Sequence, residues 1–274
     1  MNVLAIGASR NIGYYSSLRL LAAECTVTFM LRSPSVFDSD EAIQSHIKSG
    51  KAHLSKGDAL VQSDMKRAWD EASTHGNVDL LLFTVGATQA SFNLFKGFVI
   101  SPANLVTQAL LNILCTMPTQ DSPPKSIIIS SAGFNHSSYA ALPLLMKPLY
   151  AYLLKGPLKD KMGAERAIAH CTGWNWDTEH DGEPSDEIMG QGWTERKGLP
   201  AKGTLKNVLV IRPVMLTDGE CKAEKKENTA GYRVKAGDIA GGWTVSRKDV
   251  AHFVANAALN RWDEFSDKCI SIAY

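Results

Sequence analysis

The chain has 274 residues, with 29 basic and 28 acidic side chains and a net charge of +1. This length is enough for one elaborated α/β domain with a full core, and 45% hydrophobic against 21% charged residues excludes a disordered chain. The balanced charge leaves no electrostatic footprint for nucleic acid, so we expect no nucleic-acid partner. Five scattered cysteines form neither a CxxC pair nor a disulfide framework, which indicates reduced thiols in a cytoplasmic protein.

Apolar segments argue against targeting or membrane insertion. An apolar strand begins at Asn2, which leaves no room for a cleavable leader. The run Ala140–Leu154 is broken by two prolines and a lysine and is shorter than the ~18 residues that a membrane span needs. We therefore expect a soluble, intracellular protein without a membrane span.

Short apolar runs alternate with longer amphipathic ones. The predicted strands are Asn2–Ile6, Thr26–Leu31, Ala52–Leu54, Val78–Phe83, Ser126–Ile129, Asn207–Ile211 and Lys268–Ile272. The predicted helices are Ile12–Ala23, Asp38–Ser49, Met65–Ser73, Pro102–Leu114, Asp160–His170 and Arg247–Asn260. The alternation of strands with helices predicts right-handed βαβ units and a parallel sheet. Because the strands are apolar without internal alternation, we expect the sheet to be covered on both faces. The expected fold is a doubly wound α/β sheet spanning residues 1–274 as one domain.

Two segments interrupt this alternation, at about residues 133–157 and 173–203. The first carries three tyrosines, and the second is rich in glycine, tryptophan and acidic residues. Loops of this length inside a compact domain are usually functional, and both precede strands of the carboxyl half, where a doubly wound sheet builds its crevice. We expect them to form the substrate pocket or its lid.

A glycine-bearing turn follows the first strand. Gly7-Ala8-Ser9-Arg10-Asn11-Ile12-Gly13 opens the next helix, where backbone amides and the helix dipole favour a pyrophosphate. Arg10 and Asn11 stand where related motifs place a middle glycine, so a structural turn without a ligand stays open as an alternative.

The end of the second strand indicates which nicotinamide cofactor would bind. NAD-binding enzymes place an acidic residue there for the ribose hydroxyls, but this chain has Arg32 and no acid before Asp38. A guanidinium suits a 2′-phosphate, and Arg10 could reach the same group from the glycine turn, which favours NADP(H) over NAD(H). A solvated surface arginine is the alternative.

Five pieces of sequence occur in an order that marks a known family. They are Gly7–Gly13, Leu31–Ser33, Ser130–Gly133, Ile211–Gly219 and Ser246–Phe253. Together they resemble the atypical short-chain dehydrogenases/reductases of the NmrA-like group, in particular uncharacterised NAD(P)-binding proteins of fungi. The resemblance spans nearly the whole chain.

The resemblance implies a set of cofactor contacts. The glycine turn would bind the pyrophosphate, Arg32 the 2′-phosphate, Gly57-Asp58 the adenine, and the residues after the sixth strand the nicotinamide. The implied contacts are Gly7, Ser9, Arg10, Asn11, Ile12, Arg32, Asp58, Gly86, Ala87, Lys161, Pro213, Val214 and Met215. Gly86 has the alternative of merely ending a strand, and Pro213 of merely shaping a turn.

The resemblance also implies catalytic residues, with one departure. The wider family uses Ser, Tyr and Lys, with the tyrosine four residues before the lysine. Ser130 and Ser131 end the fifth strand where the serine belongs, and Lys161 is the candidate lysine. Pro157 stands four residues before Lys161 and has no proton to give.

Other residues could replace the missing tyrosine. Tyr139, Tyr150 or Tyr152 from the first inserted segment could supply the acid, because catalytic roles depend on geometry rather than on order. Lys161 could itself be the acid. We expect Lys161, Ser130, Ser131, Tyr139 and Tyr152 as the catalytic candidates.

The acidic part of the second inserted segment does not predict a metal site. Asp177, Glu179, His180, Asp181 and Glu183 are close in sequence but lack recognised ligand spacing, so we expect a solvated loop. The three tryptophans of this segment would either cover a hydrophobic substrate or anchor the loop. The run Ala140–Leu154 would form, in order of preference, a pocket wall, a homodimer interface or a membrane-surface patch.

These observations favour an NADPH-dependent reductase of a small, mostly apolar carbonyl, enone or imine compound. The cofactor would supply the redox chemistry and the protein the positioning. One alternative is a non-catalytic NADP(H)-binding regulator of the NmrA type, which the missing tyrosine supports. Another is a non-redox isomerase or lyase on the same fold.

Overall fold

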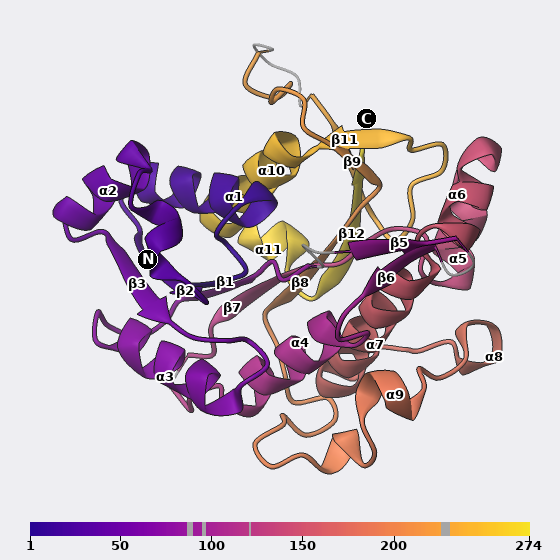
Figure 1. The fold of residues 1–274 in the computed structure, drawn as a ribbon, viewed down its shortest axis with the longest axis horizontal. Helices are drawn as coiled ribbons and strands as arrows, with labels where there is room; N and C mark the ends of the chain where they lie inside the picture. Colours follow the sequence, from indigo (N-terminus) through magenta and orange to yellow (C-terminus); the bar gives the residue numbers. More distant parts are fainter. Residues whose placement is uncertain (87–89, 95–96, 121, 226–230) are drawn as a thin grey trace.

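The computed structural model of the chain describes residues 1–86, 90–94, 97–120, 122–225 and 231–274. Its centre is an eight-stranded sheet that is parallel except for one edge strand (Figure 1). Across the sheet the strands are β10 (Arg233–Ala236), β12 (Lys268–Ala273), β8 (Val208–Pro213), β7 (Lys125–Ile129), β4 (Leu80–Phe83), β1 (Asn2–Ile6), β2 (Thr26–Leu31) and β3 (Ala52–Lys56). This order confirms the expected doubly wound α/β fold.

Helices cover both faces of the sheet, as Figure 1 shows. One face packs against α1 (Asn11–Ala22), α2 (Glu41–Lys48), α10 (Arg247–Asn260) and α11 (Trp262–Phe265). The other packs against α3 (Gln62–Ser73), α4 (Leu105–Cys115) and α7 (Lys155–Thr172).

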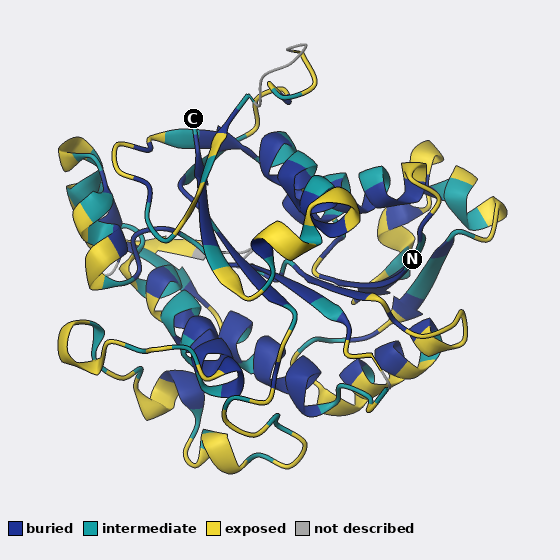
Figure 2. Cartoon of the chain, turned by 180° about the vertical axis from the view of Figure 1, so that it is seen from behind, coloured by how far each residue is buried: buried dark blue, intermediate teal, exposed yellow. Residues whose placement is uncertain are grey.

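Side-chain alternation divides the strands between two hydrophobic cores. In β1, Val3 and Ala5 join the first core, whereas Leu4 and Ile6 join the second, and all four are fully buried. Figure 2 shows burial concentrated in the sheet and on the inward faces of the helices. A parallel sheet buried on both faces explains why the strands read as unbroken apolar runs.

The two inserted segments are short helices and turns rather than long loops. Residues 133–157 contain α5 (His136–Ala141), a 3-10 turn (Leu144–Met146) and α6 (Lys147–Tyr152). Residues 173–203 contain α8 (Thr178–Asp181), α9 (Asp186–Met189) and a 3-10 turn (Trp193–Glu195). These elements are too short to produce a helical period in the sequence, which is why it did not predict them.

Helix starts differ most from the sequence prediction. The helix expected at Asp160–His170 begins at Lys155 and includes Pro157, because a first-turn proline gives up no intrahelical hydrogen bond. The helix expected from Asp38 begins at Glu41, because the Asp40 side chain accepts the Ile43 amide.

The antiparallel edge strand β10 and four further strands were not expected from the sequence. β5 (Ala90–Asn93) and β6 (Gly97–Ile100) form an antiparallel hairpin, and β9 (Met215–Thr217) pairs in parallel with β11 (Thr244–Ser246). Each has three or four residues, too few for a periodic signal. Within the described ranges, none of the helices is long and apolar enough to cross a membrane.

A buried carboxylate joins the carboxyl-terminal elements. Asp249, in the first turn of α10, accepts hydrogen bonds from Ser246 Oγ at 2.9 Å, Tyr274 Oη at 2.6 Å and the amides of Lys222 and Ala223. Burial alone would raise the pKa of Asp249, but these hydrogen bonds lower it below its ordinary value. Tyr274, the residue that follows β12, is thereby tied to the start of α10 and to the loop after β9.

Asp249→Asn should destabilise the fold by about 1–3 kcal/mol at pH 7, because an amide cannot accept all four donors. A lowered pKa makes the contribution of Asp249 complete above its unfolded pKa and lost as pH falls through the folded pKa. Urea unfolding should therefore show a gap between wild type and variant that narrows below about pH 4. Asp263→Asn, at an exposed position, is the control; a gap that does not depend on pH would contradict the account.

Candidate functional site

The turn between β1 and α1 is shaped by glycine. Gly7 has φ +79°, and a Cβ there would come within 2.7 Å of the Val85 amide nitrogen. A Cβ on Gly13 would collide with Thr84 Oγ1. Both glycines thus let the turn approach the end of β4, and side chains at these positions would force it away.

The amino end of α1 is open. Its cap residue, Arg10, makes no side-chain cap hydrogen bond, and the first turn holds no acidic residue. Asn11 has φ 57°, Ser9 is half-buried, and Ile12 is buried in the core beneath. First-turn amides without a side-chain cap, together with the helix dipole, suit an anion.

Two arginines lie at the carboxyl ends of neighbouring strands. β1 and β2 pair in register from Asn2↔Thr26 to Ile6↔Met30, so Arg32 follows one strand while Arg10 belongs to the turn after the other. Both are exposed, and neither forms an ion pair or hydrogen bond with any described residue. Most other arginines of the chain have a carboxylate or carbonyl partner, so this pair stands out as uncompensated charge.

The remaining expected contacts of the adenosine half lie after β3 and β4. Asp58 Oδ1 accepts the Leu60 amide, and the Asp58 amide donates to Asp64 Oδ2, so this turn is held by its own hydrogen bonds. Gly86 is half-buried, and a Cβ there would meet nothing within 4 Å. Ala87 lies outside the described residues.

Lys161 projects from α7 to the carboxyl edge of the sheet. Its ammonium donates to Ile129 O, at the end of β7, at 2.7 Å and to Val85 O, just after β4, at 3.2 Å. Burial lowers the pKa of Lys161 from 10.5 to about 8, against the opposing effect of Asp160 and Glu165. A partly buried ammonium at this edge can bind a ligand oxygen or release a proton near neutral pH.

Asp160 holds the helix that carries Lys161. Its carboxylate accepts the amides of Val106 and Thr107, each at 2.8 Å, at the amino end of α4, and Thr107 Oγ1 donates to its carbonyl at 2.7 Å. Burial raises the pKa of Asp160 more than these hydrogen bonds lower it. The residue next to Lys161 is therefore fixed at three points.

The two candidate serines have different surroundings. Ser130 is buried, and its hydroxyl has no hydrogen-bond partner among the described residues. Ser131 donates from Oγ to Ala132 O at 3.0 Å. Ser130 directly follows Ile129, whose carbonyl binds Lys161, so an unpaired hydroxyl lies next to the lysine in the chain.

The tyrosines of residues 133–157 are not equivalent. Tyr139 donates to Lys147 O at 3.2 Å, and Tyr152, which is exposed, donates to Leu94 O. Tyr150 is buried against Gly133 and makes no hydrogen bond with a described residue, and burial raises its pKa to about 12. Catalytic roles for Tyr139 and Tyr152 stay predictions. Each hydroxyl would first have to break its hydrogen bond to a backbone carbonyl before it could donate to a substrate.

The end of β8 and the two residues after it lie at the carboxyl edge of the sheet and contact residues 133–157. Pro213 O accepts the Ala132 amide, Val214 is buried in the first core, and Met215 packs against a small apolar cluster. That cluster is formed by Phe134, Leu142, Tyr150 and Leu158. Residues 133–157 are thus attached to the segment expected beside a nicotinamide.

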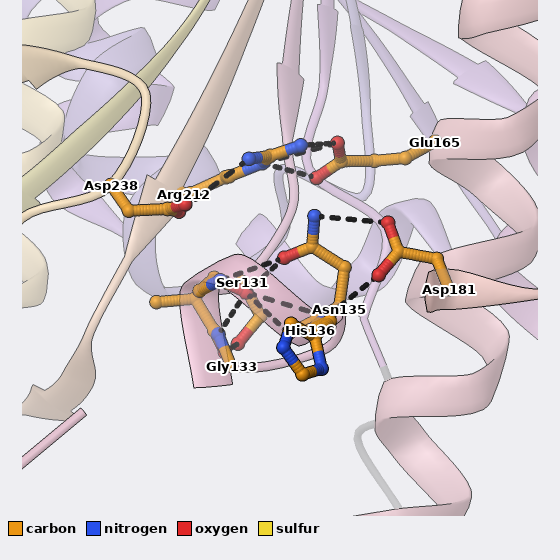
Figure 3. Close-up of polar contacts among 10 residues, drawn as sticks. Ser131, Gly133, Asn135, His136, Glu165, Asp181, Arg212 and Asp238 are labelled. Carbon is orange, nitrogen blue, oxygen red and sulfur yellow. Dashed lines mark hydrogen bonds and ion pairs between the residues drawn. The ribbon is translucent and has the colours of Figure 1, made fainter. Parts of the chain in front are cut away.

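A polar pocket of about 290 Å³ opens beside this edge. Arg212, near the end of β8, forms a bidentate ion pair with Glu165 of α7, with the closest oxygen at 2.6 Å, and its guanidinium lies 3.7 Å from Asp238 (Figure 3). Burial alone would lower the pKa of Arg212, but Glu165 raises it above its usual range. The lining residues are Asn135, His136, Ser137, Asn175, Trp176, Asp177, His180, Asp181 and Arg212.

The second inserted segment forms part of the pocket lining and is held there by hydrogen bonds and ring contacts. Asp181 accepts the His136 amide at 2.6 Å and Asn135 Nδ2 at 3.4 Å, as Figure 3 shows. The Arg166 guanidinium lies over both the Trp176 and the Trp193 rings and pairs with Glu183. Trp193 therefore anchors the segment, whereas Trp176 also lines the pocket.

Sequence reasoning missed Arg212, Glu165 and Asn135. A charged side chain inside the apolar run of β8 was the available signal, because a buried charge needs a partner. Glu165 lies four residues after Lys161 and therefore on the same helix face. Nothing in the sequence indicated Asn135. No group of three or more potential metal ligands occurs within the described ranges.

No family model matches the chain. Its sequence is 29% identical over 154 residues to a protein of Aspergillus terreus described as "Reductase pytE". The match covers 55% of this chain and 48% of that protein, so it spans only about half the length of that curated relative.

Solved structures of reductases share the fold. Yeast methylglyoxal/isovaleraldehyde reductase Gre2, complexed with NADPH, superposes with a TM-score of 0.61 at 13% identity, covering 100% of this chain and 78% of Gre2. ChuY of Escherichia coli O157:H7, described as an anaerobillin reductase, gives 0.57 at 16% identity, covering 99% and 96%. At such identities the likeness shows the fold alone, a mostly parallel sheet with helices on both faces.

Lys161 should make stability depend on pH in the alkaline range. Between about pH 8 and pH 10 the unfolded chain keeps a proton on this lysine that the folded chain has lost, so folding becomes more favourable as pH rises. Relative to Lys161→Met, the wild-type free energy of unfolding should rise with a slope approaching about 1.4 kcal/mol per pH unit. Urea unfolding across this range measures it, with the exposed Lys159→Met as control; parallel curves would contradict the lowered pKa.

Proposed function

We propose that this protein is an NADPH-dependent reductase of a small carbonyl, enone or imine compound, of the NmrA-like type. The observation that carries the proposal is the open β1–α1 turn with two uncompensated arginines, Arg10 and Arg32, at the ends of adjacent strands. A phosphate-rich ligand matches both features, because amides and guanidinium groups are its preferred partners. The reductase of Aspergillus terreus and the NADPH complex of Gre2 support the same assignment.

The residues present fit NADPH. Gly7 and Gly13 leave room where side chains would collide with the end of β4, and Ser130 offers a buried hydroxyl without a partner. The turn and α1 would hold the pyrophosphate, Arg10 and Arg32 the 2′-phosphate, and Lys161 the nicotinamide ribose. When bound, the cofactor would supply two electrons for reduction.

The protein's own groups would orient the substrate and handle the proton. Lys161 is held at the edge by two carbonyls and stays partly protonated near its pKa of about 8. Residues 173–203 would cover the pocket and exclude water. Every lining residue except Trp176 is polar or charged, so the part of the substrate in this pocket carries hydrogen-bonding groups. The mostly apolar character that we expect applies to the remainder of the substrate.

Cofactor preference provides the test. NADPH should bind more tightly than NADH, and Arg32→Ala should weaken NADPH binding by about 1.5–3 kcal/mol, because a charge-assisted phosphate contact is lost, while NADH binding stays unchanged. Fluorescence titration measures both affinities. Arg261→Ala is the matched control. Arg261 forms an ion pair with Glu264 of α11, and it precedes β12, so it does not lie at the carboxyl end of a strand as Arg32 does.

Two results would contradict the proposal. Equal NADH and NADPH affinity in wild type would remove the 2′-phosphate assignment. Tight NADPH binding without turnover across a panel of carbonyls, enones and imines would instead favour the cofactor-binding regulator. Oxidation of NADPH that depends on one of these compounds is the expected result.

A further inference from the structure

An aspartate–histidine pair of the second inserted segment opens into the pocket. His180 Nδ1 lies 2.9 Å from Asp177 Oδ2 and 3.1 Å from Oδ1, and Asp177 Oδ1 also accepts the His180 amide. Both residues line the pocket together with Arg212. A carboxylate against Nδ1 fixes the proton on that nitrogen and leaves Nε2 free for a second partner.

The pair has the properties of an acid–base unit. The amide of His180 lowers the pKa of Asp177, so its carboxylate keeps its charge. A fixed carboxylate stabilises the imidazolium that forms when Nε2 binds a proton, which is the role of the carboxylate in catalytic triads. His180 is about half exposed, so water can return the proton after each turnover.

We infer that His180 is the general acid of this reductase, positioned by Asp177, in place of the tyrosine that is absent before Lys161. The inference rests on the proposed reductase function. The geometry that supports it is the position of the pair in a pocket whose other wall is Arg212 of β8 and Asn135, at the carboxyl edge of the sheet.

The proton step balances for a carbonyl substrate. The carbonyl carbon gains a hydride from NADPH, the C=O π bond breaks, and its electron pair passes to oxygen. The Nε2–H bond of the imidazolium breaks, the proton forms an O–H bond with that oxygen, and His180 is left neutral. The hydride and its two electrons would come from NADPH when it is bound, so that the carbonyl becomes an alcohol, and solvent protonates His180 again.

Charged groups around His180 come from several elements. Its own segment contributes Asp177 and Asp181, α5 contributes His136 with a ring centroid 5.3 Å away, and β8 contributes Arg212 backed by Glu165 of α7. Further along α7, Arg166 pairs with Glu183. The His136 ring contacts no carboxylate among the described residues, which makes it the reference for the ring tautomer of His180 in the same pocket.

Tyr150 is the competing donor. Its hydroxyl has no described partner, but it belongs to the apolar cluster beneath residues 133–157 and is not among the residues that line the pocket. Burial raises its pKa to about 12, which makes it a poorer acid than an imidazolium. Tyr150→Phe therefore separates the two candidates.

The first experiment needs no substrate. Nitrogen-detected NMR of the histidine rings should show His180 protonated at Nδ1 in its neutral form, whereas His136 should favour the ordinary Nε2 tautomer. Asp177→Asn should remove this difference. An Nε2-protonated His180 in the wild-type protein would overturn the inference.

The second experiment measures turnover of a substrate from the panel. His180→Gln should lower kcat about 100-fold or more and leave NADPH affinity within about twofold. The decrease of wild-type kcat with rising pH should disappear in this variant. Added imidazole should restore activity to His180→Ala. Tyr150→Phe should retain most activity.

The outcomes separate this inference from the proposed function. Full turnover by His180→Gln, or loss of turnover confined to Tyr150→Phe, overturns the inference and leaves the reductase intact. Failure of wild type to bind NADPH, or to oxidise it with any compound of the panel, overturns the proposed function and the inference with it.

Discussion

The arrangement of the candidate site depends on one buried carboxylate. Asp160 accepts two amides at the start of α4 while belonging to α7, so it sets how far along the sheet these two helices lie relative to each other. Gly163 allows this approach, since a Cβ there would come within 2.5 Å of Thr107 Oγ1. Lys161 and Glu165 take their places from this contact, one against the ends of β4 and β7 and the other against Arg212 of β8.

Charge is distributed unevenly along the carboxyl edge. At β1 and β2 the cations Arg10 and Arg32 lack partners within the described chain, whereas at β8 the cation Arg212 is matched by Glu165 and approached by Asp238. An unpaired arginine that stays solvated destabilises the fold little, and its charge can attract a phosphate group. The matched pair is nearly dry, so its role is to hold the pocket wall in one geometry.

The sequence predicted the framework because the framework is periodic. Seven unbroken apolar runs and the glycine turn are enough to predict the parallel sheet and its nucleotide edge. All seven predicted strands lie within two residues of the observed ends, and Asn2–Ile6 and Thr26–Leu31 match in full. The pocket is built from residues 133–142 and 173–190, whose helices have four to six residues and leave no period to detect. The two segments are joined by single hydrogen bonds between residues far apart in the sequence, such as that from the His136 amide to Asp181. A local sequence pattern cannot predict such contacts.

The candidate site residues also differ in whether a sequence pattern could predict them. Lys161 was found because a family spacing pointed to it, but its partners Val85 and Ile129 are backbone carbonyls that any sequence would offer. For Asp177 and His180 the sequence predicts only a solvated loop, since three-residue spacing on a surface helix has no ligand signature of its own. In the structure, Asp181 attaches α8 to the start of α5. This contact places Asp177 and His180 in the same pocket as Arg212. The pocket therefore depends on the docking of a short inserted segment onto a regular sheet.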